Sequence, residues 1–351
     1  MPTRFRLQHL SVVIDDPQRI VADETQRMGA AYSSVRSSLS NEPAALLRIV
    51  VGDDPHGGSH GEPIEQVWQG TLDGVAFAVS RRGPRRRIEV PGQGVVDFHV
   101  EQGWAALDVA PRADGWGKWF LLFRTICDGL TRGGHCFAHA ACLAVERREG
   151  WRGVVLTAPS NSGKTTTALA LTRSNRWRLL GDDVAYVRPA ALGSRVWGLP
   201  RACHIRSGTL KLLPWLSELE LSPPDAEGVR HLASNQLLGG GGAAWPWLDP
   251  TLVIVLDPPN PRGTIVEPLD RAGALNQLAA ESLSAIPGVC DEDAGRDFVT
   301  FGRLVCTAAT CRMSVGPDPC EAAEKLERFL DERDERTSSL GAKREIRRRA
   351  A

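Results

Sequence analysis

Short alternations of apolar and polar or small residues fill the first third of the chain. Segments such as Gly74–Val79 and Gly94–Val100 place a large apolar residue at every second position, and clusters of glycine, proline and arginine separate them. Alternation with period two, interrupted by turn residues, predicts β-strands. The arginine-rich stretch Arg81–Arg87 lies between two such segments, so we interpret it as a solvated hairpin turn and not as a basic binding patch.

The pattern changes near residue 115. In Trp116–Leu130 the apolar residues recur at helical spacing, which predicts a helix. Beyond it, short apolar runs typical of buried strands alternate with longer periodic segments typical of helices. The predicted strands are Ala140–Val145, Gly153–Thr157, Arg178–Leu180, Ala185–Val187 and Thr251–Leu256, and the predicted helices are Lys164–Arg173, Ala272–Leu283 and Cys320–Asp334. This alternation predicts an α/β domain with a central sheet flanked by helices.

We therefore divide the chain into three regions: a β-rich N-terminal region over residues 1–115, an α/β domain over 116–331 and a charged tail over 332–351. Gly239–Gly242 predicts a flexible loop or linker. The tail consists mostly of charged residues, serine, glycine and alanine, and we expect it to be frayed or disordered.

Composition narrows the class of protein. The chain is 42 % hydrophobic and 24 % charged with a formal net charge of zero, so we expect neither nucleic acid nor an anionic membrane as a partner. It lacks an apolar run long enough to span a bilayer and a secretory signal, which predicts a cytoplasmic location. The eight cysteines include no C-x-x-C pair, which favours buried free thiols over a zinc site or disulfides.

The strongest chemical signal is the stretch Gly153–Leu171, in which a short apolar strand leads into a loop and Gly163-Lys164-Thr165 opens an apolar-periodic helix. This is the context of a phosphate-binding loop, whose backbone N–H groups and helix N-terminus surround phosphate oxygens. The lysine reaches the β- and γ-phosphates and the threonine hydroxyl ligates Mg²⁺. The predicted nucleotide-binding residues are Ala158, Pro159, Ser160, Asn161, Ser162, Gly163, Lys164, Thr165 and Thr166. Ala158 replaces the first glycine of the usual pattern, and Pro159 has no N–H to offer.

Two acidic positions are candidates to complete the metal site. Asp182 and Asp183 follow the apolar run Trp177–Leu180, one helix and one strand after the loop. Asp257 ends the apolar run Thr251–Leu256, as a Walker B carboxylate does. The paired aspartates suit activation of a hydroxyl nucleophile, because one carboxylate can hold Mg²⁺ while the other accepts a proton.

The order of these features resembles that of the HPr serine kinases and HPr-kinase-related proteins: a histidine at a strand start, the phosphate loop, a helix and an Asp-Asp pair. Here these are His139, Ala158–Thr165 and Asp182-Asp183, and Leu199–Arg206 resembles a Pro-Arg segment that follows in relatives. The resemblance covers about residues 116 to 330 and implies a phosphoenolpyruvate-carboxykinase-like α/β domain.

By position, the resemblance implies that Asp182 is the catalytic base, with Lys164 and His139 assisting transfer. It implies Mg²⁺ binding by Thr165 and Asp183, and phosphate contacts by Arg201 and Arg206. The loop has fewer glycines than the family pattern, Ala140 follows His139 where the family has glycine, and residues 1–115 have no counterpart.

The expected function is that of an ATP- and Mg²⁺-dependent kinase acting on a serine-type hydroxyl of a protein, peptide or small molecule. An ATPase or GTPase with Asp257 as its Walker B acid is the alternative, and a non-catalytic nucleotide-binding scaffold is a third hypothesis. The sequence leaves open whether the protein forms a homo-oligomer.

Overall fold

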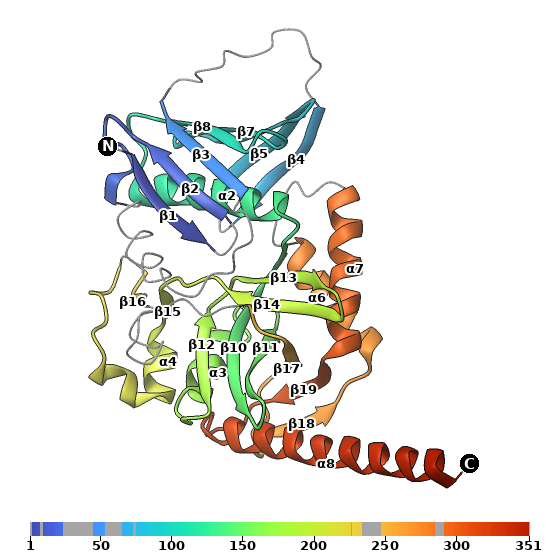
Figure 1. Ribbon diagram of the computed structural model, residues 1–351. Coiled ribbons are helices and arrows are strands. Elements are labelled where there is room, and N and C mark those ends of the chain that lie inside the picture. The colour runs from blue at the N-terminus through green and yellow to red at the C-terminus, as the bar shows by residue number, and fades with distance from the viewer. Residues whose placement is uncertain are drawn as a thin grey trace.

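The computed structural model describes residues 2–7, 10–23, 45–52, 65–72, 75–225, 227–233, 247–284 and 291–350. It is a mixed α/β protein with several sheets and a β-rich N-terminal region (Figure 1). The predicted glycine loop Gly239–Gly242 lies outside the described residues. None of the described helices is both long and apolar enough to cross a membrane.

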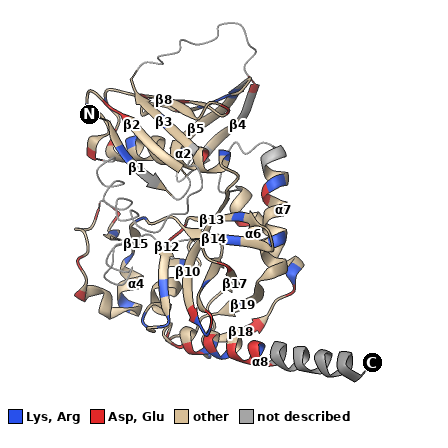
Figure 2. Cartoon of the chain, in the orientation of Figure 1, with Lys and Arg blue, Asp and Glu red and all other residues tan. Residues whose placement is uncertain are grey.

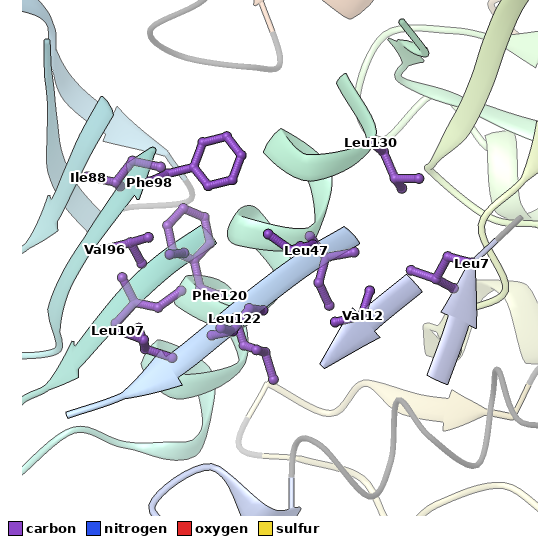
Figure 3. Close-up of a cluster of buried hydrophobic side chains, with 14 of the residues drawn as sticks. Leu7, Val12, Leu47, Ile88, Val96, Phe98, Leu107, Phe120, Leu122 and Leu130 are labelled. Carbon is purple, nitrogen blue, oxygen red and sulfur yellow. The ribbon is translucent and has the colours of Figure 1, made fainter. Parts of the chain in front are cut away.

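The N-terminal region forms an eight-stranded sheet in the order β1-β2-β3-β8-β7-β6-β5-β4. Its strands are β1 (Thr3–Leu7), β2 (Leu10–Asp15), β3 (Ala45–Val51), β4 (Glu65–Leu72), β5 (Val75–Arg82), β6 (Arg85–Val90), β7 (Gly94–His99) and β8 (Trp104–Val109). Alternate residues such as Ile88 and Val96 point toward the helix α2 (Gly115–Arg132), which lies along one face of the sheet (Figure 3). The predicted period-two strands are thus confirmed, because each buries one face against this helix.

Helix α2 matches the predicted helix Trp116–Leu130. It begins where the Asp114 side chain accepts a hydrogen bond of 2.7 Å from the Gly117 backbone N–H, which caps the first turn. Its buried face contains Leu121, Leu122 and Ile126. Burying each such side chain contributes on the order of 2 kcal/mol, so α2 belongs energetically with the sheet that it covers.

The hairpin predicted around Arg81–Arg87 is present, with its turn between β5 and β6. One of its arginines is not solvated, however. The Arg86 side chain is only 14 % exposed and forms an ion pair with Asp128 of α2 at 3.2 Å. Residue alternation along β6 directs Arg86 toward the helix, which a linear charge pattern does not reveal.

The second half of the chain is built on a six-stranded sheet in the order β12-β10-β11-β17-β19-β18. Its strands are β10 (Ala140–Arg147), β11 (Gly150–Thr157), β12 (Trp177–Gly181), β17 (Pro250–Asp257), β18 (Ile265–Pro268) and β19 (Ala309–Ser314). Strands β11, β17 and β19 are parallel, and their carboxyl ends lie at one edge of the sheet.

Both faces of this sheet are covered, so its strands are apolar on both sides. On one face lie α3 (Lys164–Leu171) and α8 (Glu321–Ala350), and on the other lie α6 (Arg271–Ser284) and α7 (Asp291–Thr307). Leu156 of β11 packs with the first pair, and its neighbour Val155 packs with the second. This arrangement explains why these strands read as continuous apolar runs.

Two small sheets complete the fold and border the candidate site. One has the order β14-β13-β9, and the other pairs β15 with β16. Their strands are β9 (Cys136–Ala138), β13 (Ala185–Ala190), β14 (Gly193–Gly198), β15 (Cys203–Ile205) and β16 (Arg230–Leu232), and the short helices α4 (Ser207–Leu212) and η2 (Pro214–Glu218) follow β15.

The C-terminal part differs from the sequence-based expectation in two places. Helix α7 is not predicted, because its first half is polar and its buried apolar residues, Phe301, Leu304 and Val305, lie in its second half. The tail from residue 332 is not irregular, since α8 continues to Ala350. Glutamate, arginine, lysine and alanine favour the helix there, and no proline interrupts it. Figure 2 shows acidic and basic residues along the first part of this helix.

The predicted free thiols are confirmed for the described cysteines. Five of them are buried: Cys127, Cys136, Cys142, Cys203 and Cys311. Cys306 and Cys320 are exposed, contrary to the prediction of burial.

Candidate phosphoryl-transfer site

The loop between β11 and α3 occupies residues 158–163 at the edge where the parallel strands end. Gly163 is the residue before the helix and has φ 89°, ψ 15°, a left-handed conformation that glycine adopts without steric cost. Asn161 also has a positive φ of 65°, whereas Ala158 is not among the described residues with positive φ. Alanine is therefore tolerated in place of the usual first glycine, and its side chain is buried in the core beneath the loop.

Lys164 begins α3, and its side chain is only 5 % exposed. Its Nζ lies 3.2 Å from the Ala158 carbonyl oxygen, to which it donates, and 3.1 Å from Nε2 of His139. Oδ1 of Asp183 lies 3.8 Å from the same nitrogen. Burial lowers the pKa of Lys164, while the charges of Asp183 and Asp182 act in the opposite direction. The ammonium group is thus held over the loop by residues from three separate segments.

The two aspartates occupy a tight turn after β12. Gly181 and Gly198, at the ends of β12 and β14, approach so closely that a Cβ on Gly198 would lie 2.5 Å from the Gly181 nitrogen. The Leu199 N–H donates to the Val184 carbonyl at 3.0 Å and closes the turn against β14. Asp183 has φ 61°, a conformation that costs a non-glycine residue on the order of 1 kcal/mol. Close backbone packing therefore fixes both carboxylates.

Asp182 is the most unusual acid in this part of the molecule. It is 2 % exposed, and its Oδ2 accepts a hydrogen bond of 2.9 Å from the Thr165 hydroxyl. Its other oxygen, Oδ1, is buried and has no hydrogen-bond partner within the described part of the chain. Burial raises the pKa of Asp182 to about 7, and the negative charge of Asp183 acts in the same direction. The hydrogen bond from Thr165 lowers the pKa by a smaller amount. A buried carboxyl oxygen without a partner is costly unless a proton, a cation or a ligand uses it.

His139 lies between β9 and β10 and faces the same cluster. Its backbone N–H donates to the Ser282 hydroxyl of α6 at 3.2 Å, and Nε2 lies 3.9 Å from Oδ1 of Asp183. Burial and the neighbouring Lys164 lower the pKa of His139, so the imidazole is neutral at pH 7. The unprotonated nitrogen of a neutral imidazole can accept a hydrogen bond from the lysine ammonium group.

Comparisons with known proteins add little to this geometry. No protein-family model matches the chain, and no curated protein matches it. The solved structures that match include the Hpr(Ser) kinase/phosphatase from Coxiella burnetii. That structure has 16 % sequence identity and a TM-score of 0.30, and the match covers 58 % of this chain and 96 % of that chain. A TM-score of 0.30 is too low to assign chemistry, which therefore depends on the site itself.

The other predicted nucleotide-binding residues differ in their contacts and exposure. The Thr166 hydroxyl lies 2.9 Å from the Thr209 hydroxyl and links α3 to α4, so this side chain is engaged within the protein. The loop itself contains Pro159, Ser160, Asn161 and Ser162. The first three of these are exposed.

The two arginines differ. The Arg201 guanidinium lies over the rings of Trp119 and Phe123, at 5.5 Å and 5.8 Å from their centroids, and its charge lowers the pKa of Asp182. Arg206 is exposed before α4, and among the described residues it has no ion pair. Only Arg201 is thus brought to the site.

Asp257 ends β17, the parallel neighbour of β11, and so lies at the same sheet edge as the loop. Its carboxylate is 3.7 Å from Arg312 of β19, and no contact joins it to Lys164 or Thr165 among the described residues. The contact with Thr165 is made by Asp182 instead.

Magnesium fits the residues present. The described chain has no group of three or more His, Cys, Asp and Glu residues arranged to hold a metal unaided. Mg²⁺ bound with a nucleotide takes one or two protein oxygens and completes its shell with phosphates and water. The Thr165 hydroxyl and the unpartnered Oδ1 of Asp182, or the nearby Asp183 carboxylate, are oxygen donors of this kind.

Sequence reasoning missed several residues around the site. Ser282 supports the His139 backbone, and Glu281 of α6 acts on the pKa values of both His139 and Lys164. Trp119 and Phe123 fall at apolar positions of the predicted helix Trp116–Leu130, but the pattern does not reveal that they contact Arg201. These residues lie 78 to 143 positions from the residues that they support, and no local pattern marks them.

Proposed function

We propose that this protein is an ATP- and Mg²⁺-dependent kinase that transfers the γ-phosphate to a serine-type hydroxyl of a protein, peptide or small molecule. The observation that carries the proposal is the cluster of Lys164, Thr165, Asp182, Asp183 and His139. A loop-anchored lysine, a metal-ligating hydroxyl and a buried carboxyl with a pKa of about 7 are the groups that hydroxyl phosphorylation requires.

In this mechanism the backbone N–H groups of the loop and Lys164 bind the nucleotide phosphates. Mg²⁺ bound by Thr165 and Asp183 supplies neutralisation of phosphate charge. Asp182 accepts the hydroxyl proton as the acceptor oxygen bonds to the γ-phosphorus. The bond from this phosphorus to the β-γ bridging oxygen breaks, and ADP leaves with the electron pair. The neutral His139 holds the Lys164 ammonium in place.

The roles of the two aspartates can also be assigned the other way round, with Asp182 as the metal ligand and Asp183 as the base. The Thr165 hydroxyl donates to Asp182, which places Asp182 next to the expected metal ligand, while Asp183 lies nearer Lys164. If Asp182 holds the metal and Asp183 takes the proton, Asp182→Asn raises the Mg²⁺ concentration needed for half-maximal transfer, and excess Mg²⁺ or Mn²⁺ restores the rate. If Asp182 is the base, no metal concentration restores it.

The test of the function uses the full-length protein with γ-³²P-labelled ATP, Mg²⁺ and extract fractions that supply acceptors. We expect label in an acceptor as alkali-labile, acid-stable phosphoserine, and none with Lys164→Met. Release of labelled inorganic phosphate without any labelled acceptor contradicts the kinase proposal.

A second function, nucleotide hydrolysis coupled to a partner, has one observation in its favour. Asp257 ends the strand next to β11 in parallel register, the position of a Walker B acid. That function predicts acceptor-independent turnover that Asp257→Asn abolishes and Asp183→Asn leaves intact. Nucleotide binding with neither transfer nor turnover supports the scaffold hypothesis instead.

A further inference from the structure

Two aromatic side chains of helix α2, which covers the N-terminal sheet, lie beside Arg201. Trp119 and Phe123 lie one turn apart on α2, and their rings stack with centroids 4.7 Å apart and an interplanar angle of 11°. Both are partly buried against the core that α2 shares with the N-terminal sheet. The two rings thus form an aromatic stack beside Arg201.

Arg201 lies on this surface. Its Cζ is 5.5 Å from the Trp119 centroid and 5.8 Å from the Phe123 centroid, distances at which a cation is attracted to the ring face. Within the described part of the chain the guanidinium has no hydrogen bond and no ion pair, so its N–H donors remain available to a ligand. A guanidinium attracted to aromatic rings uses none of its N–H donors for that contact, so the donors can bind an anion.

The backbone next to Arg201 is hydrogen-bonded to the turn that contains Asp182 and Asp183. Two residues earlier, Leu199 donates its N–H to the Val184 carbonyl and is fully buried. The positive charge of Arg201 also acts on Asp182 and His139, which places the guanidinium within electrostatic range of the cluster. The same arginine therefore contacts α2 and lies within electrostatic range of the site.

We propose that Trp119 and Phe123 form a platform that positions Arg201 on the phosphoryl group in transfer, which makes α2, together with the N-terminal sheet that it covers, part of the catalytic apparatus. This inference depends on the proposed function and assigns a role to a region that the sequence left without one. Trp119 and Phe123 are positioning residues, since they act through Arg201, and Arg201 is the residue that contacts phosphate. An arginine placed in this way stabilises charge that develops during transfer more than it stabilises bound nucleotide.

The experiment needs no identified acceptor, because MgADP with aluminium fluoride imitates the planar phosphoryl group. Titration calorimetry on the full-length protein measures the affinity for MgADP with and without aluminium fluoride. In the Trp119→Leu, Phe123→Leu double variant the apolar bulk remains and the ring faces are lost. We expect it to bind MgADP as the wild type does and to bind the aluminium fluoride complex roughly three- to thirty-fold more weakly, the range of a cation–π contact. Arg201→Ala should lose at least as much.

Trp119→Phe keeps a ring face and should retain most of the selectivity for the aluminium fluoride complex. Trp151→Leu is the matched control, because it removes another ring near an arginine, Arg178 at 5.4 Å, at the amino end of β11, opposite the end from which the loop leads. We expect no selective loss in this control. Thermal unfolding of each variant checks the fold.

The outcomes separate the two proposals. If the wild type binds the aluminium fluoride complex tightly and the double variant binds it equally tightly, the platform inference is wrong while the kinase proposal stands. If the wild type binds MgADP and gains nothing from aluminium fluoride, the proposed phosphoryl transfer itself fails. Equal weakening of MgADP and its aluminium fluoride complex assigns the platform to folding and overturns the inference.

Discussion

Replacing Asp182 by asparagine should stabilise the metal-free protein at alkaline pH and abolish transfer at the same time. The amide has nearly the shape of the carboxyl and can still accept the Thr165 hydrogen bond, but it carries no charge. In the wild type the buried carboxylate is ionised at a cost, since burial and the charge of Asp183 raise its pKa to about 7. The substitution removes that cost.

The size of the effect follows from the pKa difference between the two states. The folded protein retains the Asp182 proton up to about pH 7, whereas the unfolded chain loses it near the ordinary value of 3.8. A raised carboxyl pKa means that the folded state binds more protons between these values, so the free energy of unfolding falls as the pH rises through this window. On raising the pH from 5 to 8, the free energy of unfolding falls over the roughly two pH units between pH 5 and the folded pKa of about 7. This fall corresponds to about 3 kcal/mol. The variant should lack this component.

Urea unfolding at pH 5 and pH 8, without Mg²⁺ or nucleotide, measures the difference. Asp182→Asn should gain up to about 3 kcal/mol relative to the wild type on going from pH 5 to pH 8. Asp257→Asn is the matched control, because Asp257 is an acid at the same sheet edge with an ion pair to Arg312, and its effect should not follow this profile. An Asp182→Asn variant that is equally destabilised at both pH values would show that the carboxyl is not ionised at a cost. Transfer at a near wild-type rate in the variant would refute its role as base.

Four further substitutions, one of them a control, test the geometry of the site. Gly198→Ala should displace the aspartate turn and cost about 1–3 kcal/mol of stability together with transfer, since its Cβ would meet the Gly181 nitrogen at 2.5 Å. Gly208→Ala, with open space around the new Cβ, should leave both unchanged or slightly improved in the same unfolding and transfer assays. Lys164→Met should weaken binding of a fluorescent ATP analogue at least tenfold, whereas unchanged affinity would remove the lysine from the phosphate site. Gly163→Ala should cost about 1–2 kcal/mol in thermal or urea unfolding, because its φ of 89° is left-handed, and unaltered stability would contradict this account.

The sequence by itself determined the local structure of the site. An apolar strand, a short loop with Gly163, and an apolar helix are consequences of backbone preference and periodicity within about twenty residues. The same holds for the period-two strands of the N-terminal region and for α2, whose apolar residues recur at helical spacing. These features depend on neighbours in the chain, and neighbours in the chain are what a sequence displays.

Only the tertiary structure decided which groups meet. His139 and Asp183 come from separate connections between strands and converge on Lys164. The burial of Asp182, which raises its pKa, depends on the close contact of Gly181 with Gly198. The same reason applies to the hairpin arginine Arg86, which a charge pattern assigns to solvent and packing assigns to Asp128. Desolvation and distance are properties of the assembled core, so no segment of the sequence encodes them alone.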